Sequence, residues 1–157
     1  MRGKVKTNKN PILPDLKHNS LVVSKMINYI MKSGKKSVAE KIVYGALDII
    51  AKKTKKSPAE ALDIAIKNVS PSVEVKSRRV GGASYQIPVE VRSNRKLFLA
   101  FNWLVGAAQG KKGKPMKEKL AEEILLALNN EGVAIKKKND VHRMAEANKA
   151  FAHFAWR

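Results

Sequence analysis

A basic β-hairpin interrupts a sequence that otherwise has the periodicity of helices. Residues 74–92 read EVKSRRVGGASYQIPVEVR, with β-branched residues on both sides of a Gly-Gly pair and a tyrosine after it. This composition is typical of two antiparallel strands joined by a tight turn. Arginines stand near the turn, where they repel one another unless an anionic partner lies opposite. The hairpin therefore restricts the chain to a fold that carries one protruding basic arm.

The other segments contain apolar residues at the three- and four-residue spacing of amphipathic helices. We find three such segments before the hairpin and three after it. The predicted fold is mainly α, with a two-stranded β-hairpin arm that protrudes between the third and fourth of six helices. We predict a single domain over residues 1–157, made of an extended basic arm (1–19), three helices (20–72), the hairpin arm (73–91), and three helices with a C-terminal tail (92–157).

Two helix starts are marked by a serine three residues before a glutamate. Ser37 precedes Glu40 at this spacing, and Ser57 precedes Glu60. The spacing is that of a capping box, which satisfies backbone N–H groups at a helix N-terminus. Pro58 also stands at a position that favours the first turn of a helix. We therefore expect Ser37 and Ser57 to cap the second and third helices.

The turn of the hairpin decides which residues face one another across the strands. A three-residue turn, Gly81–Ala83, pairs Val75 with Val89, whereas a two-residue turn sets Val75 against a proline. Cross-strand packing favours the three-residue turn. That register also places Tyr85 opposite Arg79, and an exposed ring there could stack on a base for about 1 to 3 kcal/mol.

The net charge of the chain indicates a polyanionic partner. Lysine and arginine together number 32, against 13 aspartates and glutamates, which gives +19. A small soluble domain usually carries a net charge of about 2 to 8. The excess destabilises the compact protein alone, but it becomes favourable beside a polyanion that releases counterions on binding. Nucleic acid is therefore the first candidate partner, ahead of an anionic membrane surface.

The composition also excludes several other classes. The chain has no cysteine, so disulfides and thiolate chemistry are excluded. The longest uncharged apolar run, residues 97–110, is too short to span a bilayer, and the N-terminus lacks the apolar middle of a signal peptide. We therefore expect a cytoplasmic protein without a membrane partner. The three histidines, His18, His142 and His153, lack the close spacing of paired metal ligands, and no cofactor is predicted.

Basic residues gather in clusters along the chain, and several clusters fall at predicted loop ends, among them residues 136–138, which precede the sixth helix marked by Val141, Met144 and Ala145. Clusters of this kind on one compact fold predict a composite phosphate-binding surface. The candidate nucleic-acid contacts on this surface are Arg2, Lys4, Lys6 and Lys9 in the N-terminal arm, Lys35 and Lys36, Lys76, Arg78 and Arg79 in the hairpin, Arg92, Arg95 and Lys96 after it, Lys111, Lys112 and Lys114, and Lys136, Lys137 and Lys138.

Three other classes of protein share some of these features. DNA-architectural proteins also combine helices with basic β arms, and they insert a proline between base steps. Pro88 argues against that class because it is predicted within a strand, away from the tip. An RNA-modifying enzyme needs a catalytic or cofactor motif, and we recognise none. A membrane-surface protein needs an exposed apolar helix face, whereas the apolar faces here are needed for the core.

Three segments, taken in order, closely resemble the bacterial family of small-subunit ribosomal protein seven. They are GKKSVAEKIVYGA (34–46), PSVEVKSRRVGGASYQIPVEVR (71–92) and DVHRMAEANKAFAHFAWR (140–157). The resemblance covers nearly the whole chain. It implies a bundle of six helices with a hairpin between the third and fourth, in agreement with the pattern described above.

The resemblance also implies a function and partners. Proteins of this family bind 16S ribosomal RNA in its 3′ major domain, initiate assembly of the head of the 30S subunit, and lie near the tRNA exit site and the mRNA exit path. They are structural proteins and not enzymes. Exit-site tRNA and small-subunit proteins nine and eleven are the further partners implied. At matching positions the leading RNA contacts are Lys35, Lys36, Lys76, Arg78, Arg79, Arg92, Arg95 and Lys96, and the hairpin tip near tRNA is Val80, Gly81, Gly82, Ala83, Ser84 and Tyr85.

Overall fold

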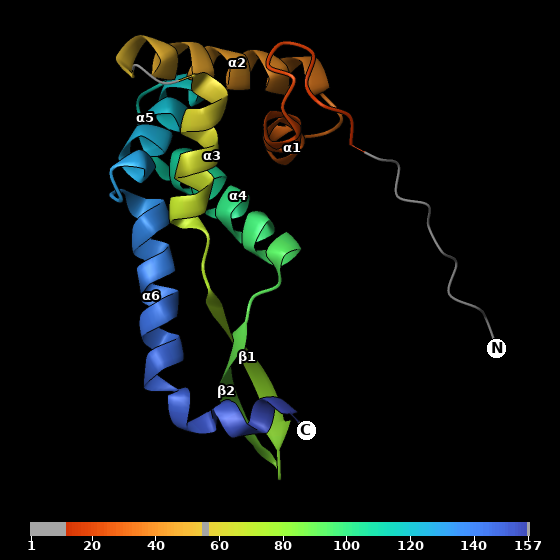
Figure 1. Cartoon of the computed structure of the whole chain (residues 1–157), viewed down its shortest axis with the longest axis vertical. Helices are drawn as coiled ribbons and strands as arrows, with labels where there is room; N and C mark the ends of the chain where they lie inside the picture. The colour runs from red at the N-terminus through yellow and green to blue at the C-terminus, as the bar shows by residue number, and fades with distance from the viewer. Residues whose placement is uncertain (1–11, 55–56, 157) are drawn as a thin grey trace, which may run out of the picture.

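The computed structural model describes residues 12–54 and 57–156 and confirms the predicted mainly helical fold (Figure 1). The hairpin lies between the third and fourth helices, as expected. The elements are α1 (Leu21–Ile30), α2 (Lys36–Lys53), α3 (Pro58–Val69), β1 (Val73–Val80), β2 (Ala83–Glu90), α4 (Ser93–Gly110), α5 (Met116–Leu128), α6 (Val133–Ala147) and the 3-10 helix η1 (Lys149–Trp156). None of the helices in this part of the chain is long and apolar enough to cross a membrane.

The core lies where the apolar faces of the six α-helices meet. Phe101 and Leu104 of α4, Leu62 of α3, and Leu120 and Ile124 of α5 are almost completely buried there. Burial of such a side chain contributes about 1.5 to 3 kcal/mol relative to exposure. Helix α5 packs against α2, α3 and α4, so it forms the centre of the bundle. The resulting body is a rigid support for the hairpin and the loops.

One of the two predicted caps is confirmed. The Ser57 side chain accepts the backbone N–H of Glu60 at 3.3 Å, at the start of α3. The prediction for Ser37 is wrong, since α2 begins at Lys36, two residues before the start that a cap at Ser37 requires, and Ser37 lies inside its first turn. The reason is a tight turn at Gly34, whose positive φ of 72° suits glycine and whose carbonyl accepts the Lys36 N–H at 2.8 Å.

The predicted three-residue turn is also wrong. The strands are joined by two residues, Gly81 and Gly82, and Val75 lies opposite Pro88. Both glycines have positive φ, 57° and 89°, as a type I′ turn requires, and the twist of such a turn matches that of the strands. Backbone geometry at the turn therefore outweighs the packing of one valine pair. The one-residue shift turns every side chain of one strand to the opposite face.

The hairpin is supported along its length by the C-terminal part of the chain. Helix α6 runs beside it, and η1 crosses it near the outer end (Figure 1). Tyr85 of β2 packs against Phe151 and Phe154 of η1, with ring centroids 5.2 and 5.4 Å away. The expected pairing of Tyr85 with Arg79 is wrong, because the observed register pairs Tyr85 with Arg78. Tyr85 anchors the arm instead of offering a free ring.

Candidate nucleic-acid interface

A buried carboxylate organises the cations at the base of the hairpin. Glu74 of β1 is only 8% exposed. One of its oxygens accepts the Arg95 Nε at 3.2 Å, and the other lies 3.2 Å from the Lys76 ammonium. The Arg95 guanidinium also stacks over the Phe98 ring, 4.8 Å from its centroid. These interactions join the hairpin to the first turn of α4. They fix the side chains of Lys76 and Arg95, which are two of the residues predicted to bind RNA.

Arg78 and Arg79 lie on opposite faces of the hairpin. Arg78 shares the face of Tyr85, and its guanidinium donates to the Phe154 carbonyl oxygen of η1 at 2.9 Å. Arg79 lies opposite Ser84 on the other face, exposed and with no side-chain hydrogen bond or ion pair among the described residues. Arg78 therefore supports the arm, while Arg79 is open to a partner.

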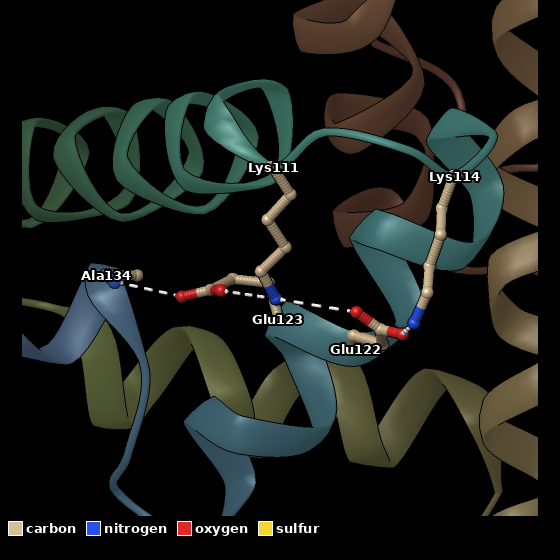
Figure 2. A network of polar contacts seen from close by, with 5 residues as sticks. All are labelled: Lys111, Lys114, Glu122, Glu123 and Ala134. Atoms are coloured by element: carbon tan, nitrogen blue, oxygen red, sulfur yellow. Dashed lines mark hydrogen bonds and ion pairs between the residues drawn. The ribbon is translucent and has the colours of Figure 1, made fainter.

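The loop between α4 and α5 holds two of its three lysines in ion pairs (Figure 2). The Lys111 ammonium lies 2.9 Å from the buried Glu123 carboxylate and 3.9 Å from Glu122. Lys114 pairs with the other oxygen of Glu122, which raises the pKa of Lys114 and lowers that of Glu122. Lys112 is exposed and makes no such contact in the described part of the chain. The neighbouring ion pairs therefore fix the loop around one available cation.

The sequence placed Lys136, Lys137 and Lys138 at a loop end, and this prediction is wrong. The three lysines lie inside α6. The helix begins at Val133 because the preceding residue, Gly132, provides a turn with φ of 95°. The Lys138 ammonium donates to the Asn68 carbonyl oxygen at 2.7 Å, whereas Lys136 and Lys137 are exposed. Lys137 and Lys111 both line a hollow of about 420 Å³ between α4 and α6. This hollow brings two predicted RNA contacts together.

Other candidate residues stand at the start of α2 and in the N-terminal segment. Lys36 at the start of α2 is 3.9 Å from Glu40, and its neighbour Lys35 is exposed. The N-terminal candidates Arg2, Lys4, Lys6 and Lys9 lie outside the described residues. Seven of the candidate side chains form no hydrogen bond or ion pair within the described ranges: Lys35, Arg79, Arg92, Lys96, Lys112, Lys136 and Lys137.

These available cations are spread over the molecule. Arg92 and Lys96 lie at one end of α4, and Lys112 follows its other end. A helix of 18 residues is about 27 Å long. The body therefore holds cations at several fixed points that are too far apart for one phosphate. This spacing suits an extended, folded polyanion.

His142 has a structural role that the sequence did not reveal. Its Nε2 accepts the backbone N–H of Ser72 at 3.1 Å, just before the hairpin begins. Burial lowers the pKa of His142, and the positive charge of Lys138 lowers it further. No group of three or more metal-binding side chains is found among the described residues. The neutral ring therefore connects α6 to the base of the arm.

Sequence analysis also missed the three carboxylates that fix the basic segments. Asp15, Glu74 and Glu123 are the buried charged residues of the described chain. For Asp15 a signal was present, since it is the only acid among the first 19 residues. Glu74 and Glu123 gave none, because Arg95 of α4 and the Ala134 N–H of α6 reach them from elements distant in the sequence.

The fold and these features define the class of protein: a mainly helical protein with a braced β arm and a basic surface suited to an extended polyanion. The model of the family described as Ribosomal protein S7p/S5e matches residues 2–149. The chain is similar to proteins named small ribosomal subunit protein uS7. It is 63% identical to that of Thermosipho melanesiensis over 91% of this chain and 92% of the relative, 59% to that of Thermotoga maritima over 94% and 96%, and 58% to that of Dictyoglomus turgidum over 99% and 98%.

The chain therefore belongs to the ribosomal protein S7p/S5e family, and the resemblance found in the sequence is confirmed. As a member it is a structural constituent of the small ribosomal subunit, an RNA-binding component of a cytoplasmic ribonucleoprotein, and not an enzyme.

Proposed function

We propose that this protein is a primary 16S rRNA-binding protein that binds the 3′ major domain and nucleates assembly of the head of the 30S subunit. The observation that carries the proposal is the set of available cations held at separate points of a rigid body. Strands of a folded RNA junction that contact several such points are held in one relative geometry. Binding would therefore select the junction conformation onto which later components assemble.

The two kinds of cation have different parts in this proposal. Arg79 and Arg92 carry planar guanidinium groups that can form paired hydrogen bonds with phosphate or a base edge. Lys35, Lys112 and Lys137 supply compact charges whose attraction to phosphate depends strongly on salt. Arginine contacts would therefore fix the register of the RNA, and lysine contacts would add affinity.

The proposal also includes the neighbours of the arm. The hairpin extends away from the helical body (Figure 1), which supports a second contact beyond the primary RNA site. We assign this contact to exit-site tRNA, beside the mRNA exit path. Tyr85 is occupied by η1, so the contact falls to the exposed residues 81–84. Small-subunit proteins nine and eleven are the proposed protein partners.

Filter binding over a salt series tests the primary site. The chain is titrated with a 3′ major-domain fragment of 16S RNA, unrelated structured RNA of equal length, and duplex DNA. We expect the ribosomal fragment to bind more tightly by orders of magnitude at physiological salt. Its affinity should fall by about three to five decades between roughly 50 and 200 mM salt if six to ten phosphates are contacted. Equal binding of all three polyanions would contradict the proposal.

Matched variants sharpen this experiment. Arg79→Gln and Lys112→Gln each remove one available charge, and each should reduce the salt slope by about 1. Arg143→Gln is the control, because Arg143 is exposed and already paired with Asp140 at 2.9 Å. The control removes the same charge outside the proposed surface. An equal loss of affinity in all three variants would indicate attraction by net charge alone.

A further inference from the structure

Residues 13–19, between the N-terminal segment and α1, form a turn that is tied to α2 (Figure 1). Its centre is Asp15, which is 7% exposed. One oxygen of the Asp15 carboxylate accepts the Tyr44 hydroxyl at 2.5 Å. The other accepts the backbone N–H groups of Lys17 and His18, both at 3.0 Å. A single carboxylate therefore closes the turn and connects it to the body.

Two further contacts fix the turn on either side of Asp15. The Ser24 hydroxyl of α1 donates to the Leu13 carbonyl oxygen at 2.7 Å. The Lys17 ammonium lies 3.1 Å from Asp48 of α2 and 5.3 Å from the centre of the Tyr44 ring. The chain is thus held to both helices within a few residues of the point where the basic segment joins it.

These polar contacts place a segment that adds little to the core. Ile12 and Leu13 are 44% and 74% exposed, and Leu16 is fully exposed. Burying a carboxylate is unfavourable unless it is well hydrogen-bonded. The apolar side chains of the turn contribute little to the core, so the hydrogen bonds of Asp15 mainly determine the path of the chain.

The hydrogen bonds of Asp15 are strong enough to keep it ionised. Burial alone would raise the pKa of Asp15, but the hydrogen bonds from Tyr44 and from the backbone of His18 and Lys17 outweigh it and lower the pKa. The hydrogen bond to Asp15 is the main reason that the pKa of Tyr44 is raised to about 12, with burial as a further cause. At neutral pH the pair is a phenol donating to a carboxylate, which is a charge-assisted hydrogen bond.

We propose that the Asp15–Tyr44 hydrogen bond is a positioning contact that sets where the basic N-terminal segment leaves the body, and thereby raises affinity for RNA without touching it. The proposal rests on the proposed function. Four cations precede the turn in the sequence: Arg2, Lys4, Lys6 and Lys9. A fixed path of the chain from residue 12 onward removes part of the ordering cost of RNA binding. The contact therefore contributes through preorganisation.

A double-mutant cycle tests the proposal in the full-length chain. Tyr44→Phe removes only the hydroxyl group. It is introduced into the native chain and into a chain in which the four N-terminal cations are replaced by Gln. We expect RNA binding to weaken about three- to tenfold in the native background and to remain unchanged in the neutralised background. Asp15→Asn should show the same dependence on background.

Tyr29→Phe is the matched control. Tyr29 is another partly buried tyrosine, it stacks on Phe101, and its hydroxyl forms no hydrogen bond within the described ranges. Tyr29→Phe should leave RNA binding unchanged in both backgrounds. Thermal unfolding of every variant confirms that the proteins are folded at the temperature of the assay.

The outcomes separate this inference from the proposed function. An equal loss for Tyr44→Phe in both backgrounds, or no loss in the native one, would overturn the positioning role. The proposed function is tested by a different ratio, the affinity of the native chain for the ribosomal fragment over unrelated RNA. If that ratio is one, the proposed function fails, whereas the comparison of the two backgrounds on the same RNA still decides the positioning role.

Discussion

Removal of the Glu123 carboxylate should destabilise the fold far more than removal of its neighbour Glu122. Glu123 has no exposed surface, and one of its oxygens accepts the Ala134 backbone N–H at 2.9 Å. Ala134 lies in the first turn of α6, whose cap residue is Gly132 and has no side chain. Glu123 therefore reaches across from α5 to cap α6, and its negative charge also suits the helix N-terminus.

The expected magnitude follows from what each substitution leaves behind. Glu123→Ala leaves a buried N–H group without an acceptor, which costs about 1 to 3 kcal/mol. Breaking a fully buried ion pair costs about 3 to 5 kcal/mol, but Lys111 is 24% exposed and can turn toward solvent. We therefore expect a total loss of about 2 to 4 kcal/mol and a Tm lower by about 5 to 15 °C. Glu123→Gln keeps an acceptor for Ala134 and should cost less.

Thermal and denaturant unfolding of the variants measure this loss. Glu122→Ala is the control, because Glu122 is partly exposed and its partner Lys114 is exposed. We expect little change in its Tm. Equal Tm values for Glu123→Ala and Glu122→Ala would refute the capping role.

The two neighbouring lysines should differ in the same way. Lys111→Met should lower Tm and leave RNA affinity almost unchanged, whereas Lys112→Met should weaken RNA binding and leave Tm almost unchanged. An equal loss of RNA affinity in the two variants would show that the ion pair with Glu123 does not keep Lys111 from binding RNA.

Two further predictions concern the arm. Arg78→Ala removes the contact to η1 and should lower Tm by about 2 to 4 °C. Arg79→Ala should leave Tm unchanged and weaken RNA binding. A fall in Tm for Arg79→Ala alone would show that Arg79, and not Arg78, supports the arm. The folded-state pKa of His142 is lowered, so its contribution to stability should be complete above its ordinary pKa of 6.5 and be lost as pH falls from that value through the lower folded-state pKa. The unfolding free energy should therefore drop between about pH 7.5 and pH 5 more in the native chain than in His142→Gln, and equal drops would contradict this.

The sequence predicted the helical body and the arm because both depend on local patterns. Apolar spacing located the helices, and the Ser57 cap marked a start that the structure confirms. The start of α6 was missed because the residues after Ala134 and Ile135 are lysines, and two buried residues give too short a pattern. The register was missed because both turn glycines adopt positive φ, a backbone preference that strand pairing does not reveal.

The candidate site was predictable as a set of residue types but not as a set of available charges. Whether a lysine can bind phosphate depends on whether an acid already holds it, and that acid can come from any part of the chain. Lys111 and Lys112 are adjacent, yet Glu123 holds one and leaves the other exposed. Arg78 and Arg79 are adjacent too, and the register alone decides which of them contacts η1. Tertiary structure thus assigns neighbouring cations to different tasks.

The three buried carboxylates give this division a common physical basis. Asp15 fixes the turn that follows the N-terminal segment, Glu74 fixes the base of the hairpin, and Glu123 fixes the loop between α4 and α5. A chain of charge +19 needs internal anions where its cations are crowded, because repulsion would otherwise loosen these segments. Each carboxylate neutralises or orders the root of a basic segment, and cations near Glu74 and Glu123, such as Arg79 and Lys112, stay exposed. The same few acids therefore make the fold compatible with its charge and leave these cations available to a polyanion.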